Sequence, residues 1–484
     1  MGASMKHEYD LIVIGGGSAG LTASRFGASV SAKTLLIEKG KLGGICTWAG
    51  CIPGKIMLHQ ARLAASGVPV TFETVSRELK ERRNYIYEQE NYPDKLRSMG
   101  IDVAEGQASF VDQHTLSIRQ ENGETRQTTG RYIIIATGSK PYIPSIAGIG
   151  RTPYLTNHSL FELPYPPESM IIVGAGPAGT EMAQAFQRLG TDVTLVDMSH
   201  HILPCEPAEI TSVLQKKLED EGVSFLLGAT PDAVQGDQHQ IVMKLRQNGE
   251  TIQRKAEKLF FATGRRVNLE SLKLPNAGIR SNSNGIIVNS ACRTNRNNIY
   301  AAGDVTGRYQ LTHMSGHMAE IAARNALLRM PVTIDARHVP WAIYTSPEIA
   351  HVGITRYELE KSGKKFETYR LPYHKIDRAV TDRVQEGWIL VYAKKRSGKI
   401  LGADIVGEQA GELISQFTLA MKNGISLKQM ADTIYPYPTI AFGARRTADQ
   451  WYVKKQNLTL IKWIRRLFRF RGPMPDLSDP DRIV

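Results

Sequence analysis

The stretch Tyr9–Gly20, which reads YDLIVIGGGSAG, decides the fold of this 484-residue chain. Its first six residues are almost continuously apolar, which predicts a buried parallel strand. The strand runs into a G-x-G-x-x-G turn whose glycines are Gly15, Gly17 and Gly20. Helix-compatible sequence follows, and a second apolar run, residues 34–37, ends in Glu38. Strand, glycine turn, helix, strand and acid in this order predict a dinucleotide-binding fold, with the helix N-terminus for the pyrophosphate and the acid for ribose hydroxyls.

The same unit recurs further along the chain, where the apolar residues 169–173 precede a second glycine motif. The glycines of this motif are Gly174, Gly176 and Gly179. The next predicted strand, residues 192–196, ends in Asp197, and no arginine follows in residues 198–201. Because an acid at this place binds a free 2′-hydroxyl and repels a 2′-phosphate, the sequence favours NADH over NADPH. Two such folds imply two cofactors, or one cofactor and one substrate nucleotide.

Two shorter repeats support an internal duplication. Residues 133–138 (IIIATG) and residues 259–264 (LFFATG) each read as a strand that stops at a glycine turn. Each lies about 90–120 residues after its own glycine motif, so the pair indicates equivalent parts of two related domains. We therefore expect Thr137, Gly138 and Gly264 at the nucleotide sites.

Cys46 and Cys51 are separated by four residues in the stretch GGICTWAGCIPGK, residues 43–55. Two thiols at this spacing can close a small disulfide, and a helix N-terminus favours the reactive thiolate. Since the pair follows the first glycine motif by about two dozen residues, we expect it to lie against a cofactor. The alternatives are a structural disulfide or half of a zinc site. Zinc needs further ligands, and because Cys205 and Cys292 are isolated we expect no metal site.

Composition narrows the function classes. The chain is 42% hydrophobic and 22% charged, which is typical of a soluble globular protein, and no run of about 18 apolar residues predicts a membrane span. Only four cysteines argue against an extracellular disulfide framework, so we expect a cytoplasmic protein. The net charge of +13 indicates acidic partners or anionic ligands, but without a base-reading motif it does not indicate nucleic acid.

The order of these motifs, followed by Gly303-Asp304 in the stretch IYAAGD, resembles the pyridine nucleotide–disulfide oxidoreductases. These FAD enzymes include lipoamide dehydrogenase, glutathione reductase and mercuric reductase. The resemblance extends to about residue 450 and implies an α/β fold class with two Rossmann-like dinucleotide-binding domains and an α+β C-terminal dimerisation domain. It implies a FAD-binding domain at residues 1–155 and 285–336, an NAD(P)-binding domain at 156–284, a dimerisation domain at 337–450 and a basic extension at 451–484.

The resemblance also implies a role for each matching residue. Lys55 would lie near the flavin and pair with Glu181. Cys51 would face the flavin as the charge-transfer thiolate, and Cys46 would be the interchange thiol that meets the substrate. FAD would be held by Gly15, Gly17, Gly20, Glu38, Lys55, Thr137, Gly138, Gly303 and Asp304. NADH would be held by Gly174, Gly176, Gly179, Glu181, Asp197 and Gly264.

One segment departs from the family pattern. Members that reduce disulfides carry His-Pro-Thr-x-x-Glu near the C-terminus. The His protonates and deprotonates the thiol, and the Glu orients the His ring. This chain has Tyr437 and Phe442 at those two positions. Tyrosine has an ordinary pKa near ~10, so it is a poor base at neutral pH. Tyr437 stays a candidate catalytic residue that could act as an acid toward an unusual substrate, and the alternative is that it is only a packed aromatic. His313 is a candidate replacement for the missing base.

The resemblance implies a homodimeric FAD enzyme that passes electrons from NADH through FAD to Cys46 and Cys51 and on to an acceptor. Our leading hypothesis is an atypical enzyme similar to dihydrolipoamide dehydrogenase. One alternative is a mercuric-reductase-like reductase of metal ions or small oxidants. Another is a flavin-based redox sensor or a membrane-docked scaffold.

The C-terminal extension mixes bulky apolar and basic residues at roughly helical spacing over residues 458–470. Such a segment could lie on an anionic membrane surface or dock an acidic carrier protein. A helix packed on its own dimer is equally compatible with the pattern. We therefore expect a cytoplasmic protein that could also be peripheral at the membrane.

Overall fold

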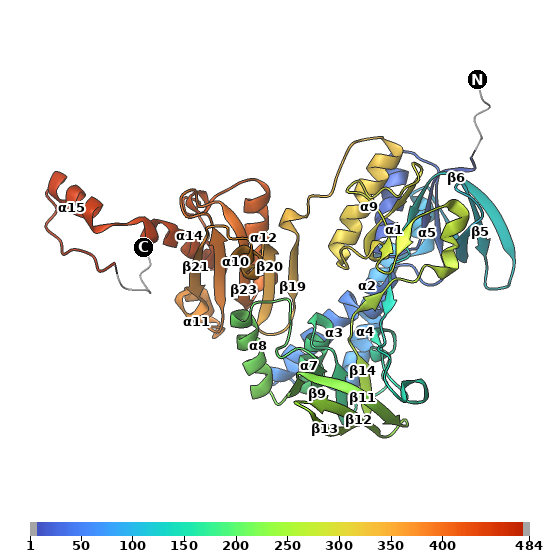
Figure 1. Cartoon of the computed structure of the whole chain (residues 1–484), viewed down its shortest axis with the longest axis horizontal. Coiled ribbons are helices and arrows are strands. Elements are labelled where there is room, and N and C mark those ends of the chain that lie inside the picture. The colour runs from blue at the N-terminus through green and yellow to red at the C-terminus, as the bar shows by residue number, and fades with distance from the viewer. Residues whose placement is uncertain (1–6, 478–484) are drawn as a thin grey trace. The chain divides into compact units, whose positions relative to one another are not determined.

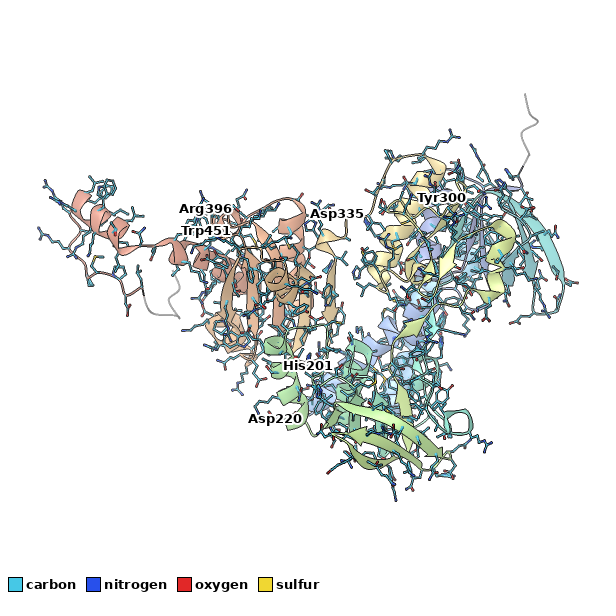
Figure 2. All side chains as sticks on the ribbon, in the orientation of Figure 1. His201, Asp220, Tyr300, Asp335, Arg396 and Trp451 are labelled. Carbon is cyan, nitrogen blue, oxygen red and sulfur yellow. The ribbon has the colours of Figure 1, made fainter. Side chains whose placement is uncertain are left out.

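The computed structural model describes residues 7–477 and divides into two compact units. The first unit runs up to His200 and resumes from Gly222 to Asp335, and the second takes up His201–Glu221 and the chain from Ala336 onward. His201 and Asp335, which border the units, are labelled in Figure 2. The finer division into FAD-binding and NAD(P)-binding domains stays a prediction. Within residues 7–477, no helix is long and apolar enough to cross a membrane.

The first unit contains a mainly parallel sheet whose strands lie in the order β3-β2-β1-β6, with β18 also paired to β6. These strands are β1 (Tyr9–Ile14), β2 (Thr34–Glu38), β3 (Ile101–Glu105), β6 (Thr125–Ile135) and β18 (Ile299–Ala301). The antiparallel strands β4 (Gln107–Phe110) and β5 (Thr115–Arg119) continue the sheet from the first part of β6.

The continuous apolar run of β1 is explained by burial on both faces of this sheet. Leu11 and Val13 pack into a cluster with helices α1 (Ser18–Ser29) and α9 (Thr312–Leu327). Ile12 and Ile14 point to the opposite face and pack into a second cluster. Figure 1 shows α1 and α9 together beside the sheet. Parallel strands covered on both sides lose the polar–apolar alternation, as the sequence indicated.

A second parallel sheet of the first unit has the order β10-β9-β8-β14. Its strands are β8 (Ser169–Val173), β9 (Asp192–Asp197), β10 (Ser224–Leu227) and β14 (Lys258–Phe261). Helix α7 (Pro177–Arg188) follows β8, as α1 follows β1. An antiparallel sheet, β11 (Ala229–Gly236), β12 (Ile241–Gln247) and β13 (Glu250–Ala256), lies next in sequence. The predicted duplication of a Rossmann-like sheet is therefore present.

The C-terminal unit is built on an antiparallel sheet of order β19-β20-β23-β22-β21. Its strands are β19 (Pro340–Ile343), β20 (Glu348–Gly353), β21 (Glu367–Pro372), β22 (Trp388–Ala393) and β23 (Ile400–Gly407). Helices α12 (Ala410–Lys422) and α14 (Phe442–Lys455) pack on it and share its core. Helix α15 (Leu458–Leu467) follows α14. This arrangement matches the expected α+β domain.

Helix α8 (Ala208–Asp220) belongs to the C-terminal unit although strands of the first unit flank it in sequence. Glu209 forms ion pairs with Arg356 at 3.3 Å and with Arg370 at 3.1 Å. The remaining α-helices are α2 (Gly44–Ala49), α3 (Cys51–Ala65), α4 (Phe72–Ile86), α5 (Pro93–Ser98), α6 (Asn157–Leu160), α10 (Arg356–Lys361), α11 (Asp377–Thr381) and α13 (Leu427–Ala431).

Candidate active site

The two glycine turns of the first unit pack their helices against their strands in the same way. A Cβ atom at Gly20 would collide with the carbonyl oxygen of Gly15, and a Cβ atom at Gly179 would collide with that of Gly174. Any other residue at either position would push the helix away from the strand. The third glycine of each motif is therefore required by close packing.

Open space lies over the N-terminus of each of these helices. Helix α1 begins after Gly17 and α7 begins after Gly176, and neither N-terminus has a side-chain cap. A Cβ atom at Gly176 would meet nothing within 4 Å, and one at Gly17 would meet only the Cα of Gly44 at 3.8 Å. Uncapped N–H groups at the positive end of a helix dipole suit a phosphate. Both turns therefore fit the pyrophosphate of a dinucleotide such as FAD or NADH.

The acids at the ends of β2 and β9 are held in equivalent positions. Each accepts one hydrogen bond from the N–H after the first glycine of its motif and one from the N–H two residues beyond itself. The donors are Gly16 and Gly40 for Glu38, at 2.5 and 2.9 Å, and Ala175 and Ser199 for Asp197, both at 2.7 Å. A carboxylate oxygen has two acceptor lone pairs, so each acid keeps capacity for ribose hydroxyls.

Three strands of the first sheet end side by side at the predicted flavin site. Backbone hydrogen bonds continue their pairing past the strand ends, from Ala136 to Ile14 at 2.8 Å and from Ala302 to Ile135 at 3.0 Å. This edge carries Gly15, Thr137, Gly138, Gly303 and Asp304. Ligands of open α/β sheets bind at the carboxyl ends of the strands, so the edge fits the role predicted for these residues.

A hydrogen-bonded chain connects Asp304 to the second nucleotide fold. The Ser139 hydroxyl donates to Asp304 Oδ2 at 2.5 Å, and Arg265 Nε donates to that hydroxyl oxygen at 2.7 Å. Arg265 Nη2 also donates to the Ser139 carbonyl at 2.7 Å. Burial lowers the pKa of Arg265, and the charge of Asp304 opposes that shift. The sequence analysis missed Ser139 and Arg265, although each directly follows an A-T-G motif.

The cysteine pair lies where two short helices meet. Cys46 is inside α2, and Cys51 is the first residue of α3, whose N-cap is Gly50. Both cysteines are free thiols, each half-buried. The N–H of Gly43, which precedes α2, donates to the carbonyl of Gly16 at 2.9 Å. The cysteine loop is thereby attached to the first glycine turn, and its position next to a flavin stays a prediction.

The two thiols of the reduced pair have opposite acidities. The Cys51 sulfur lies 3.2 Å from the Thr312 hydroxyl at the start of α9. A hydrogen bond from Cys46 outweighs burial and, together with Thr312 and the charge of Lys55, lowers the pKa of Cys51 to about 6. The same hydrogen bond, and then burial, raise the pKa of Cys46 far above its ordinary value. At neutral pH, Cys51 is therefore the thiolate and Cys46 the thiol.

Lys55 and Glu181 form the ion pair that the resemblance implied. Lys55, on α3, places its Nζ 2.8 Å and 2.7 Å from the two carboxylate oxygens of Glu181, on α7. The Glu181 side chain is only 10% exposed. The pair fixes the ammonium close to Cys51, where its charge favours the thiolate. The roles of both residues toward the cofactors stay predictions.

Trp48 stiffens the loop between the two cysteines. Its indole N–H donates to the Leu42 carbonyl at 2.7 Å, and its ring packs against Tyr87 with centroids 5.1 Å apart. Arg83 donates to the Trp48 carbonyl at 3.1 Å and forms an ion pair with Glu162 at 2.6 Å. These contacts hold α2 in place and so help to set the position of Cys46.

Tyr437, the residue at the position of the family histidine, lies in the C-terminal unit. Its hydroxyl donates to Asp377 Oδ2 at 3.0 Å, and its side chain is 65% exposed. This hydrogen bond and the charge of Asp377 raise the pKa of Tyr437. Its ring meets Phe442 edge-on, with centroids 5.7 Å apart. Tyr437 therefore stays protonated at neutral pH, and neither residue of this pair can accept a proton as the family histidine does.

A buried polar cluster of the C-terminal unit is the one group of at least three potential metal ligands within residues 7–477. It consists of Glu206, His351 and Asp404. His351 Nδ1 lies 2.5 Å from Asp404, and its Nε2 lies 3.1 Å from the Gly353 carbonyl. Burial disfavours the charged ring, but Asp404 more than offsets it and raises the pKa of His351. Each ring nitrogen of His351 thus faces an oxygen acceptor, which is the geometry of a buried hydrogen-bonded His–Asp pair.

The first unit thus contains every predicted site residue except Tyr437. His313 follows Thr312 in α9 and is exposed. The sequence analysis missed Thr312 because it lies 261 residues from Cys51 and carries no motif of its own. It also missed Asp377, which has no recognisable signal before the fold brings it to Tyr437.

Comparisons with known proteins agree with this geometry. Residues 9–319 match the family described as pyridine nucleotide-disulphide oxidoreductase, and residues 339–446 match the dimerisation domain of the same family. The second match indicates a homodimer. Together the two matches span most of the chain and agree with the predicted fold class.

Two curated relatives and one solved structure illustrate the similarity. Mercuric reductase of Staphylococcus aureus is 32% identical over 453 residues, which cover 91% of this chain and 82% of the relative. Dihydrolipoyl dehydrogenase of Bacillus subtilis (strain 168) is 31% identical over 460 residues, covering 90% of this chain and 96% of the relative. The Cu(II) complex of the HOCl-induced flavoprotein disulfide reductase RclA from Escherichia coli superposes with a TM-score of 0.85 at 27% identity, covering 92% of this chain and 100% of that one.

Proposed function

The chain belongs to the pyridine nucleotide–disulfide oxidoreductases, which bind FAD and use NAD(P)H, and from that premise we propose an NADH-dependent reductase of soft metal ions or small oxidants. Cys46 and Cys51 would be its redox-active pair, and the first glycine motif with Glu38 and Asp304 would hold FAD. The absence of an arginine after Asp197 and the two backbone bonds that hold this acid support NADH over NADPH. Bound FAD supplies hydride acceptance and electron transfer, while the protein sets distances and charge.

The observation that carries the proposal is the contrast between Cys51 and Tyr437. The surroundings of Cys51 lower its pKa to about 6. Cys46, which would meet the acceptor, has a raised pKa and therefore keeps its proton at neutral pH. A base would ordinarily remove that proton, but Tyr437 is protonated and bonded to Asp377. Because Tyr437 cannot remove that proton, an acceptor that releases the Cys46 proton by itself fits the site best.

A soft metal ion meets this requirement. A thiol that coordinates such an ion is deprotonated outright, so no general base is needed. Oxidation of the Cys46 thiol and the Cys51 thiolate to a Cys46–Cys51 disulfide releases two electrons and one proton. Two Cu(II) ions take up the electrons as two Cu(I), and the proton goes to solvent. For the whole cycle, NADH and two Cu(II) give NAD⁺, one proton and two Cu(I).

A protein-bound or small disulfide of the dihydrolipoamide class is the second candidate acceptor. The complete cysteine pair and the Lys55–Glu181 ion pair favour it, since both belong to disulfide chemistry in the family. The B. subtilis relative is named dihydrolipoyl dehydrogenase and is covered over 96% of its length. A disulfide acceptor takes up two protons together with two electrons. Tyr437 is a poor proton donor because its pKa is raised, and this disfavours a disulfide as the acceptor.

We also infer that the enzyme works in the cytoplasm. The basic C-terminal extension would then recruit it to an acidic carrier protein or to an anionic membrane surface. A flavin-based sensor without turnover is the remaining alternative, and it is separated from both reductase hypotheses by steady-state kinetics.

An acceptor screen with the FAD-loaded protein tests the proposal. NADH oxidation is followed anaerobically with Cu(II), a quinone, lipoamide and oxidised glutathione, and then with NADPH in place of NADH. We expect Cu(II) to accelerate NADH oxidation at least ~10-fold more than lipoamide does, because it needs no base. Cys46→Ser should remove this acceleration, and Cys205→Ser, at an exposed cysteine, serves as the control. A preference for lipoamide would contradict the proposal, and no acceleration by any acceptor would favour the sensor.

A further inference from the structure

Helix α15 has an apolar side that no other described residue buries. The side is formed by residues at positions i, i+3, i+4, i+7 and i+8, which is the spacing of one helix face. These residues are Leu460, Trp463, Ile464, Leu467 and Phe468. None of the residues of α15 is buried, and Trp463 and Phe468 are 60% and 61% exposed. A contiguous exposed apolar patch on a protein surface marks a site of interaction with a partner or a membrane.

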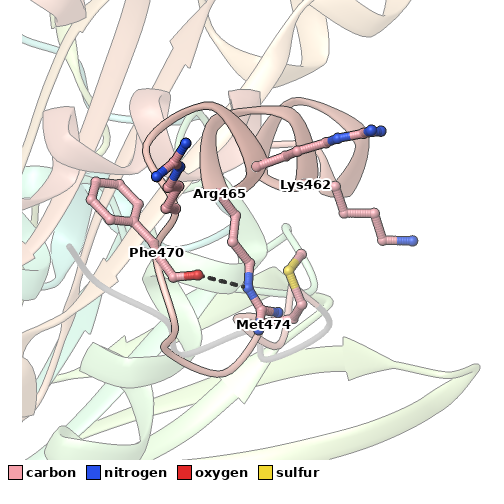
Figure 3. A pocket seen from close by; sticks show the side chains of 6 residues that line it. Lys462, Arg465, Phe470 and Met474 are labelled. Carbon is pink, nitrogen blue, oxygen red and sulfur yellow. Dashed lines mark hydrogen bonds between the residues drawn. The ribbon is translucent and has the colours of Figure 1, made fainter.

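The opposite side of α15 is basic. Lys462, Arg465 and Arg466 have the same spacing on this side, shifted by two residues, and Arg469 follows just after the end of the helix. They line an open hollow of about 360 Å³ together with Phe470 and Met474, where the chain folds back and the Phe470 carbonyl accepts a hydrogen bond from Arg465 (Figure 3). The sequence contains no acidic residue between positions 450 and 475. Within residues 450–475, the segment that contains α15 therefore carries basic charge only.

The preceding helix shows what a helix packed on this domain looks like. Trp451 of α14 is 7% exposed, and Lys455 donates to the Arg396 carbonyl at 2.8 Å while its ammonium lies 3.4 Å from the centre of the Trp451 ring (Figure 2). Helix α15 has its own N-cap, since Asn457 Oδ1 accepts from the Leu460 N–H at 2.6 Å. Figure 1 shows α15 standing clear of the sheet of the C-terminal unit. Helix α15 is thus capped locally, and none of its side chains is buried in the domain core.

We propose that α15 docks the protein on an anionic lipid surface. A helix with Trp, Phe and Leu on one side and Lys and Arg on the other lies in the plane of the interface, with its apolar side at the boundary between headgroups and acyl chains. The basic side draws the helix to anionic headgroups. A second copy of α15 would bring like charges together, which disfavours helix–helix pairing as the occupant. The proposal does not depend on which acceptor the enzyme reduces.

Vesicle co-sedimentation of the FAD-loaded full chain tests the proposal. We expect the protein to pellet with vesicles containing about one third phosphatidylglycerol at least ~10-fold more than with phosphatidylcholine alone. Binding should fall when salt is raised to about 0.5 M, because the interaction between exposed charges is screened. The Trp463 emission, isolated as the difference between wild type and Trp463→Phe, should shift to the blue on the anionic vesicles. Equal binding to both vesicles, or none to either, would overturn the proposal.

Paired variants separate the apolar side from the charge. Leu467→Asp, and separately Arg465→Glu with Arg466→Glu, should each lower vesicle binding at least ~10-fold, because insertion and attraction are both needed. The matched controls are Tyr357→Asp on α10, which is 71% exposed, and Lys216→Glu on α8, whose side chain is 75% exposed. The controls should bind within about twofold of wild type, and NADH oxidation should be unchanged in all variants.

The same variants reveal any other occupant of the helix. If Leu467→Asp turned the dimer into monomers, the apolar side would be a subunit contact and the proposal would be wrong. If the arginine variants lost binding to an acidic lipoyl-type carrier domain while vesicle binding stayed intact, a protein partner would be the answer instead.

Discussion

The two ends of the proposed electron path differ in how they handle charge. At Cys51, a neighbouring thiol, the Thr312 hydroxyl and the Lys55 ammonium all stabilise a thiolate. At Tyr437, an exposed phenol donates to Asp377 and packs against Phe442. In the proposed path the first end delivers electrons to the cysteine pair, whereas neither Tyr437 nor Phe442 at the second end takes up a proton at neutral pH. The comparison supports the proposal that the chemistry of the acceptor, and not the delivery of electrons, separates this chain from the disulfide reductases of its family.

The largest effect is expected from removing the thiolate. Cys51→Ser should abolish the long-wavelength charge-transfer absorbance on two-electron reduction and slow acceptor-dependent turnover by ~10³-fold or more, because a residue of the reacting unit is lost. Anaerobic titration followed by absorbance spectroscopy checks this. Cys205→Ser is the control at an exposed cysteine. A band that survived in Cys51→Ser would show that Cys51 is not the thiolate next to the flavin.

The next effect is expected from the Lys55–Glu181 pair. Lys55→Met leaves the Glu181 carboxylate, 10% exposed, without its counter-charge and removes a cation that favours the Cys51 thiolate. We expect reduction of the flavin by NADH to slow about 10²-fold, the usual cost of removing one positioned charge. Stopped-flow absorbance measures this rate. Glu181→Gln keeps a hydrogen-bond acceptor and should cost less; equal losses in both variants would indicate a purely structural role.

A smaller effect is expected from Thr312, one of the residues found only in the structure. The charge-transfer absorbance should be present above pH 6 and fall as the pH drops through about 6, because protonation removes the Cys51 thiolate. Thr312→Val removes a hydrogen bond to the charged form, so this loss should move to higher pH by about one unit, or ~1.4 kcal/mol. Thr312→Ser should behave like wild type. An unchanged midpoint in the valine variant would mean that the hydroxyl does not stabilise the thiolate.

The smallest effect is expected at the other end of the comparison. Tyr437→Phe removes a phenol that is 65% exposed, so the free energy of unfolding should change by no more than about 0.5 kcal/mol. Turnover with Cu(II) should stay within about twofold of wild type, because a metal ion releases the Cys46 proton without help. Thermal unfolding and steady-state rates measure the two quantities. A large loss of turnover would assign Tyr437 a proton-donating role.

Features that depend on short sequence motifs were predictable, whereas features that depend on contacts between distant residues were not. The two glycine motifs, the acids Glu38 and Asp197 and the A-T-G turns follow short, fixed spacings, so both nucleotide folds were predicted from them. Thr312 was missed because contacts between residues 261 positions apart leave no local pattern. The placement of α8 in the C-terminal unit could not be predicted either. Its Glu209 forms ion pairs with Arg356 and Arg370, but an exposed glutamate of this kind occurs in any surface helix and does not indicate its partner.

The departure at Tyr437 was visible in the sequence, but its meaning was not. Tyrosine at a catalytic position can act as an acid, or it can simply pack. The structure shows the hydrogen bond to Asp377 that raises its pKa, and Asp377 has no motif that would have pointed to it. The electrostatics of a site built from separate elements depends on distances that only the fold sets.

The most direct test restores the missing groups. In Tyr437→His with Phe442→Glu, the family base and its orienting acid would be present, and we expect lipoamide turnover with NADH to rise at least ~10-fold while turnover with Cu(II) stays within about twofold. This result would show that proton transfer alone separates the chain from the disulfide reductases. Unchanged lipoamide turnover in the double variant, or wild-type lipoamide turnover already equal to that with Cu(II), would contradict the account.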